Sequence, residues 1–164
     1  MPQKITKVSE KCIHLIEYFE CGGDVTKYLK AYKCPAGVWT IGIGTTYYPD
    51  GSKVKQGDTC TTEQAYAYLQ YELASTEIKV DSFTTDLVTQ QQFDSLVSFA
   101  YNVGTGNLKA STLLKKVNIK PADPEIEKEF NKWVYAKGVK LQGLVRRRKS
   151  EAWLYFHNEL KFDF

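Results

Sequence analysis

The sequence predicts an α+β protein, built as one helix, a small antiparallel sheet and then helices to the end of the chain. Apolar residues recur every three or four positions near the N-terminus and again from residue 61 onward, which is typical of amphipathic helices. Between these stretches, residues 28–57 are rich in tyrosine, tryptophan, valine, threonine and isoleucine, which favour strands.

The length of 164 residues, without a linker or an internal repeat, predicts one domain over residues 1–164. We expect a sheet lobe at about residues 21–60, a helical lobe at about residues 80–164, and a cleft between them. The net charge of +3 is too small to decide the kind of partner. No apolar run approaches membrane-spanning length, and the first residues, MPQKITKVSEK, lack a signal-peptide pattern. These features predict a protein made in the cytoplasm without stable membrane insertion.

The first helix is predicted over residues 5–19, where apolar side chains follow the helical period. Gly22-Gly23 ends it, because glycine readily adopts the left-handed conformation at a helix exit. Within residues 28–57, Tyr48-Pro49-Asp50-Gly51 is a turn signal between two candidate strands. These residues are therefore expected to form a small antiparallel sheet.

Two of the later helices are predicted from capping boxes, formed by Thr61 with Gln64 and by Thr89 with Gln92. The first helix of this pair is expected to reach about residue 79, and Gly104 is expected to close the second. Ser111 to Val117 forms a short predicted helix.

The last two predicted helices follow a proline signal and an apolar pattern. Asp123-Pro124 is an N-cap followed by proline at the first helical position, and that helix is expected to end at Gly138. Residues 144–159 form the final predicted helix, which is expected to bury Trp153 and Phe156.

Glu20, where the first helix gives way to a turn, is the first candidate for catalysis. Beside the apolar Phe19, its carboxyl group can be partly desolvated, which raises the pKa from ~4.3 towards neutral. A proton held in this way can be given to a leaving-group oxygen. Glu17 shares the same helical face and could itself be the acid, and a solvated glutamate at a helix end is the ordinary alternative.

Thr40 and Cys34 lie beside the strand-like stretch GVWTIGIG. The Thr40 hydroxyl could hold a water molecule, although threonine in a strand is usually explained by its β-propensity. Cys34 precedes Pro35, and its ordinary explanation is a small buried hydrophobic residue. A reactive thiol would need a positive neighbour or a helix terminus to lower its pKa.

No cofactor or metal is expected, because the spacings of the four cysteines match no zinc pattern and His14 and His157 add no ligand pair. The cysteines are expected to be reduced thiols. The run Arg146-Arg147-Arg148-Lys149 could bind phosphates, but a solvated helix face is the ordinary explanation, and no nucleic-acid-binding signature accompanies it. Tyr101-Asn102 could line a sugar subsite, with packing and capping at a helix end as the equal alternative.

Together these segments resemble the phage-type lysozymes (endolysins) of glycoside hydrolase family 24. The matching segments are Phe19-Glu20, Tyr28–Tyr47, Gly57–Leu69, Phe93–Leu114 and Gly143–Tyr155. The resemblance covers nearly the whole chain and implies a lysozyme-like bilobal fold, in which a long helix connects the sheet lobe to the helical C-terminal lobe. It also implies hydrolysis of the β-1,4 bond between N-acetylmuramic acid and N-acetylglucosamine in bacterial peptidoglycan.

The resemblance also assigns roles to residues. Glu20 matches the family's catalytic acid and Thr40 its cleft threonine, while Cys34 stands where many members carry aspartate. Tyr101 and Asn102 match the stretch that helps to line the substrate cleft. We expect Glu20 to protonate the glycosidic oxygen, and Thr40 and Cys34 to position water on the opposite face of the sugar, as in an inverting mechanism.

Two departures from the family pattern and two alternative functions remain. Gly22 to Lys27 looks like an insertion, and Thr45 stands where a histidine often follows the GIG sequence. The alternatives are a lytic transglycosylase acting on the same bond and an inactive glycan-binding protein. The resemblance further implies a monomer that waits in the host cytoplasm until a holin opens the membrane.

Overall fold

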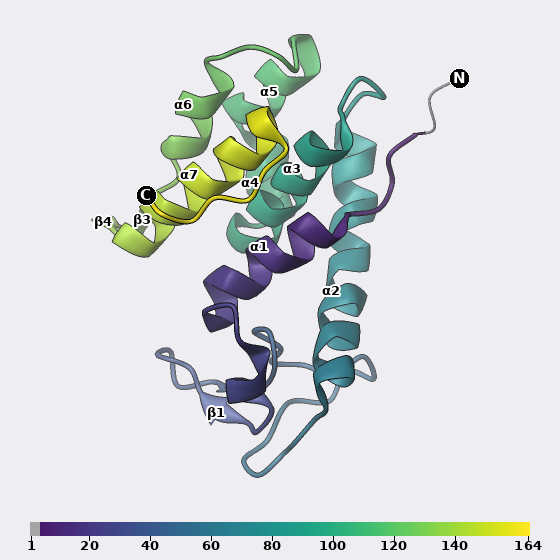
Figure 1. Ribbon diagram of the computed structural model, residues 1–164, viewed down its shortest axis with the longest axis vertical. Coiled ribbons are helices and arrows are strands. Elements are labelled where there is room, and N and C mark those ends of the chain that lie inside the picture. The colour runs from purple at the N-terminus through teal and green to yellow at the C-terminus, as the bar shows by residue number, and fades with distance from the viewer. Residues whose placement is uncertain (1–3) are drawn as a thin grey trace. The chain divides into compact units, whose positions relative to one another are not determined.

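The computed structural model describes residues 4–164, which contain seven α-helices, one 3-10 helix and two small antiparallel sheets (Figure 1). The chain forms two compact units. We call Ile16–Ser75 the sheet unit, and Thr76–Phe164 together with the chain up to Leu15 the helical unit. Within the described residues, no helix combines the length and the apolar character needed to cross a membrane.

Helix α1 spans Glu10–Cys21, so it begins later than predicted. The residues before it bind side chains of the helical unit instead of extending the helix. The Val8 N–H donates to Glu77 Oε2 at 2.8 Å, and the Ser9 N–H and hydroxyl both donate to Asp94. Burial raises the pKa of Asp94, and the hydrogen bonds from Ser9 oppose that shift.

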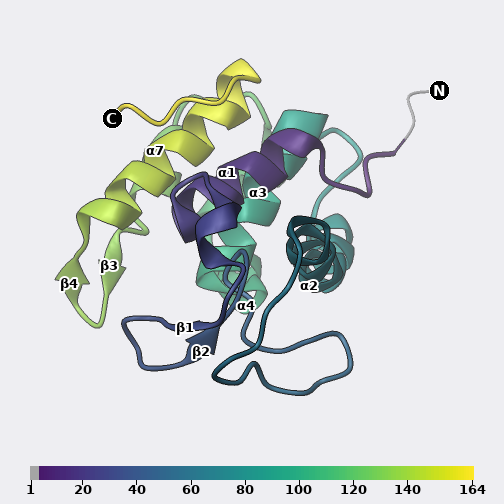
Figure 2. The ribbon, with the colours of Figure 1, turned by 60° about the horizontal axis from the view of Figure 1, so that its bottom comes forward.

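The sheet unit has a smaller sheet than predicted (Figure 2). Strands β1 (Tyr32–Lys33) and β2 (Trp39–Thr40) pair antiparallel, with Tyr32 opposite Thr40. The rest of the expected sheet consists of single bridges, one of which joins Tyr47 to Lys53 across the predicted turn at Tyr48–Gly51. Ala31, Ile41 and Val54 form the buried core of this region.

The first predicted capping box is confirmed, and a short helix lies before it in sequence. The 3-10 helix η1 (Val25–Tyr28) has Asp24 as its N-cap and overlaps the segment from Gly22 to Lys27. Helix α2 (Thr62–Phe83) begins with the predicted box, because the Gln64 N–H donates to Thr61 Oγ1 and the Thr61 N–H donates to Gln64 Oε1.

The helical unit is centred on α3 (Gln90–Val103), which packs against α7 (Gln142–His157). The capping box of Thr89 with Gln92 is confirmed at the start of α3. Three shorter helices lie between α3 and α7 in sequence, and Figure 1 shows α6 running beside α7. They are α4 (Thr105–Ala110), α5 (Thr112–Ile119) and α6 (Ile126–Asn131).

The predicted helix ending at Gly138 is wrong. Helix α6 ends at Asn131 and is followed by a hairpin of β3 (Tyr135–Ala136) and β4 (Val139–Lys140). The two turn residues, Lys137 and Gly138, both have positive φ, at 50° and 78°. Such a two-residue turn matches the twist of a hairpin, so Gly138 marks a turn between strands and not the end of a helix.

Two expectations for α7 are also wrong. Trp153 and Phe156 are half-buried, whereas Leu154 and Tyr155 are the fully covered residues of that turn. The basic run is not a solvated face throughout, because Arg147 and Arg148 are buried.

Candidate active site

Glu20 lies in the last turn of α1 and is half-buried, with its carboxylate against the backbone of Gly44. A Cβ atom on Gly44 would lie 3.0 Å from Glu20 Oε2, and Gly44 has a φ of +73°. Paired backbone hydrogen bonds between Ile41 and Thr45 close this turn, at 2.8 and 3.0 Å. The turn therefore brings a residue without a side chain against the carboxylate, and glycine alone fits there without strain.

Thr45 closes the same turn and is fully buried. Its hydroxyl has no hydrogen-bond partner within residues 4–164. The family that the sequence resembles often has a histidine at this position. In this chain the side chain there is uncharged and enclosed.

Glu17, the other candidate acid, is buried and engaged in a hydrogen bond. Tyr66 donates its hydroxyl proton to Glu17 Oε1 at 2.8 Å. Burial, together with this hydrogen bond, raises the pKa of Tyr66 to about 12, so the phenol keeps its proton at neutral pH. The geometry leaves Glu20 as the more accessible of the two carboxylates.

Cys34 and Thr40 lie at the two ends of the β1–β2 hairpin and share Val38 as a partner. The Cys34 N–H donates to the Val38 carbonyl oxygen at 3.0 Å, and the Thr40 hydroxyl donates to the same oxygen at 3.0 Å. Because Thr40 uses its proton in this way, its oxygen remains able to accept a hydrogen bond from water.

The Cys34 thiol differs from an inert buried cysteine, because it is half-exposed and its pKa is lowered. Hydrogen bonds from the backbone N–H groups of Val38 and Ala36 lower the pKa, and burial opposes the shift. Neither a cationic neighbour nor a helix terminus is needed, since donors to the charged form suffice.

The other three cysteines are unlike Cys34. All four are free thiols, and burial raises the pKa of Cys12, of Cys60 and of Cys21, the last to about 11. The Cys21 thiol is buried and donates to the Glu17 carbonyl oxygen at 3.2 Å. Within residues 4–164, no group of His, Cys, Asp and Glu side chains could hold a metal ion.

Tyr32 is a further candidate for the site that the sequence did not reveal. It pairs with Thr40 across the hairpin, and its ring lies 4.9 Å from that of Tyr28. Burial raises the pKa of Tyr32, and the charges of Glu20 and Cys34 act in the same direction. Tyr32 therefore lies beside Thr40 in the sheet unit, opposite a residue that we expect at the site. A correct strand register, with Tyr32 opposite Thr40, would have identified it.

Tyr101 and Asn102 belong to the helical unit, in the last turn of α3. Asn102 Oδ1 accepts a hydrogen bond from Arg148 at 2.8 Å, and Arg148 is fully buried beside Glu151, with Nε 2.8 Å from Oε2. This buried guanidinium group orients the amide of Asn102.

Asn102 also lines a cavity of about 310 Å³. Its walls include Trp133 and Tyr135, two aromatic residues that no pattern in the sequence assigned to a site. Recognition of the β3–β4 hairpin would have indicated Tyr135, because this residue lies in its first strand.

Comparison with known proteins identifies similar chains. A family profile described as phage lysozyme matches residues 26–151. The endolysin of Acyrthosiphon pisum secondary endosymbiont phage 1 is 36% identical over 152 residues, which cover 90% of this chain and 97% of that protein. The endolysin of Bacillus phage B103 is 40% identical over 154 residues, or 94% of this chain, which spans only 56% of the length of that relative.

A solved structure with the same fold is the endolysin from Escherichia coli O157:H7 phage FAHEc1. It is 33% identical to this chain and superposes with a TM-score of 0.85. The match covers 94% of this chain and 96% of that one.

Proposed function

The chain belongs to the phage lysozyme family, and we propose that Glu20 is the proton donor with which it cleaves peptidoglycan. As a lysozyme of the endolysin type, it is a muramidase that hydrolyses the β-1,4 bond between N-acetylmuramic acid and N-acetylglucosamine. The observation that carries the proposal is the half-buried carboxylate of Glu20 against Gly44.

The proposed mechanism is an inverting hydrolysis. Glu20 gives its proton to the glycosidic oxygen as the bond breaks and positive charge develops on the sugar ring. The Thr40 oxygen accepts a hydrogen bond from the attacking water, since its own proton is donated to Val38. Cys34 helps to hold this water, whose oxygen bonds to the anomeric carbon while one of its protons is released to solvent, from which Glu20 is protonated again. Inverting enzymes keep acid and base roughly 6.5–9.5 Å apart to admit such a water.

In the helical unit, we assign Tyr101 and Asn102 to a substrate subsite. The support for Asn102 is the cavity that it lines together with Asn107, Trp133 and Tyr135. Tyr101 does not line this cavity, and its assignment rests on its place in the matching segment. Aromatic rings with a few polar groups are typical of small-ligand sites.

The decisive test is Glu20→Gln, which keeps the shape of the side chain but removes its acidic proton. We expect clearing of cell-wall suspensions to fall by about 10²- to 10⁴-fold, with unchanged thermal unfolding. Glu17→Gln is the matched control, because it makes the same change one turn earlier on α1 and can still accept from Tyr66. Near-normal clearing by Glu20→Gln would overturn the assignment. Mass spectrometry of the products separates hydrolysis from transglycosylation, whose products are lighter by one water.

We also propose how the enzyme reaches its substrate. It acts as a monomer and waits in the host cytoplasm until a holin opens the inner membrane. Its similarity to phage endolysins supports this proposal. Expression in the host with and without a holin tests it: lysis without a holin would contradict the proposal, as would a dimer in analytical ultracentrifugation.

A further inference from the structure

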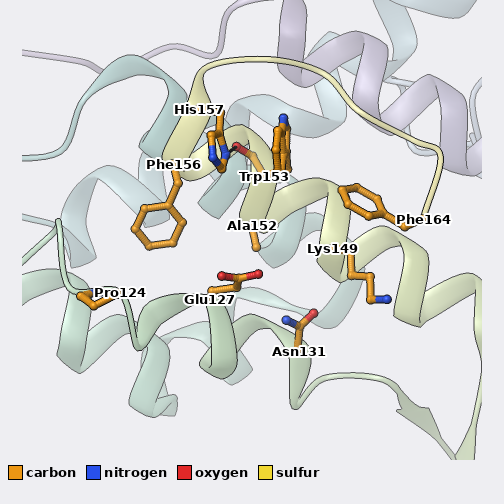
Figure 3. Close-up of a pocket in the computed structure, with 9 residues that line it drawn as sticks. All are labelled: Pro124, Glu127, Asn131, Lys149, Ala152, Trp153, Phe156, His157 and Phe164. Carbon is orange, nitrogen blue, oxygen red and sulfur yellow. Dashed lines mark hydrogen bonds between the residues drawn. The ribbon is translucent and has the colours of Figure 1, made fainter.

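A second cavity, of about 520 Å³, lies in the helical unit between α6, α7 and Phe164 (Figure 3). It contains none of the residues that we propose for catalysis. Its volume is within the range of small-ligand sites, about 300–1,000 Å³. Glu127 and Asn131 of α6 line one side, and Ala152 and Phe156 of α7 line the other.

Trp153 forms a rigid part of this wall. Its indole N–H donates to Glu159 at 3.1 Å, and the His157 ring stacks on it at 3.7 Å, 16° from parallel. The Lys161 ammonium group lies 4.5 Å from the centre of the indole ring. His157 therefore covers one face of the Trp153 ring.

The charged residues that line the cavity differ from their neighbours. On α6 and the residue before it, Glu125 pairs with Lys128 at 2.9 Å and Glu129 pairs with Lys132 at 2.8 Å. In contrast, Glu127 forms no ion pair with any residue between 4 and 164.

The same contrast appears on α7. Arg147 and Arg148 both pair with Glu151, whereas Lys149, the next residue, has no ion-pair partner in the described part of the chain. The cavity therefore contains one carboxylate and one ammonium group that are available to a ligand, on two facing helices with an apolar floor between them.

We propose that this cavity binds the peptide stem of peptidoglycan; the identity of this ligand rests on the proposed function. The stem is a short peptide with methyl side chains, a free ammonium group and free carboxylates. Glu127 would bind the ammonium group, Lys149 a carboxylate, and Ala152 with Phe156 the methyl groups. The two charged groups are less suited to a bare glycan, because its sugars carry no charge to match them.

The first experiment is a titration of the ¹⁵N-labelled full chain with the free tetrapeptide L-Ala–γ-D-Glu–meso-diaminopimelate–D-Ala. We expect resonances of α6 and α7, including the Trp153 indole, to shift. Glu127→Gln and Lys149→Met should each weaken binding by about two- to fivefold, the range for exposed ion pairs. Glu125→Gln and Lys128→Met are matched controls, because they remove the same charges from the same unit outside the cavity and should leave binding unchanged.

The proposal is overturned if the tetrapeptide leaves α6 and α7 unshifted, or if the cavity variants bind as tightly as the controls. It is also overturned if a peptide-free N-acetylglucosamine tetramer shifts the same resonances, because the ligand would then be glycan. A second experiment compares clearing of intact walls with clearing of walls stripped of stems by an amidase. The cavity variants should be slower than the parent on intact walls only. A parent protein that clears neither wall would contradict the proposed function, and the titration would still decide the cavity.

Discussion

The contact between Gly44 and Glu20 makes the activity sensitive to a residue that has no chemistry of its own. In Gly44→Ala the new methyl group would lie 3.0 Å from Glu20 Oε2, closer than normal packing allows, so the carboxylate must move. We expect wall clearing to fall by about two- to tenfold, because the carboxylate must give by a few tenths of an ångström and misplacement by about 1 Å can cost about 10²-fold in rate. The measurement is clearing rate beside urea unfolding.

Gly51→Ala is the matched control for this change. Gly51 also has a positive φ, of +86°, but nothing lies within 4 Å of its added Cβ. Both variants carry the backbone strain of alanine at positive φ, about 1–2 kcal/mol. Only Gly44→Ala should lose activity beyond that shared cost, and equal clearing by the two variants would show that Gly44 acts through folding alone.

Cys34 occupies a position where nearby hydrogen-bond donors favour a negative charge. The N–H groups of Val38 and Ala36 lower the pKa of the thiol by donating to its charged form. The same donors can bind a carboxylate, so Cys34→Asp should retain clearing, whereas Cys34→Ala should lose about tenfold or more because nothing then holds the water. Parent-like clearing by both variants would make the position structural.

The residue types at the site were easier to predict than their surroundings. Glu20 and Thr40 were assigned through their place in the matching segments, and both lie in the sheet unit. The donors that lower the pKa of Cys34 could not be predicted, because they are backbone groups whose direction depends on a turn closed by a hydrogen bond from Gly37 to Cys34.

Among the elements, helices that begin with a side-chain cap were predicted well. The box of Thr89 with Gln92 is present at α3, with the Gln92 N–H donating to Thr89 Oγ1 and the Thr89 N–H donating to Gln92 Oε1. Thr89→Ala removes one half of this box and should lower the free energy of unfolding by about 1 kcal/mol. Urea denaturation measures this loss of stability. The control is Thr112→Ala, which changes the exposed first residue of α5, a helix whose N-cap is Ser111. Equal stability of the two variants would show that the box contributes nothing measurable.

The elements that were missed lack such local signals. Helix α4 has six residues, of which Leu108 alone is buried, so no apolar period marks it. The β3–β4 hairpin depends on Lys137, which adopts a positive φ that its residue type does not favour. Tertiary packing determines where both elements form, and the pattern of a single sequence carries no information about that packing.

At the scale of the whole molecule, the helical unit depends on a buried ion cluster that joins α3 to α7. Glu151 Oε1 accepts hydrogen bonds from Ser98 at 2.8 Å and from Arg147 and Arg148 at 3.1 Å each. In sequence, Glu151 follows Arg148 by three residues and Arg147 by four, which is the spacing of an ordinary ion pair on a helix surface. The burial of these three side chains was therefore not predicted.

Glu151→Gln should therefore be the most destabilising of the conservative changes considered. Glutamine keeps the shape of the side chain, but it leaves Arg147 and Arg148 buried without a negative charge, and breaking a buried pair costs about 3–5 kcal/mol. Glu125→Gln removes the same charge from an exposed pair and should cost about 0–1 kcal/mol. Equilibrium urea unfolding measures both. Because Arg148 also orients Asn102, Glu151→Gln should weaken substrate binding at temperatures where the variant is still folded. A loss of stability no larger than that of Glu125→Gln would mean that the two guanidinium groups find other partners.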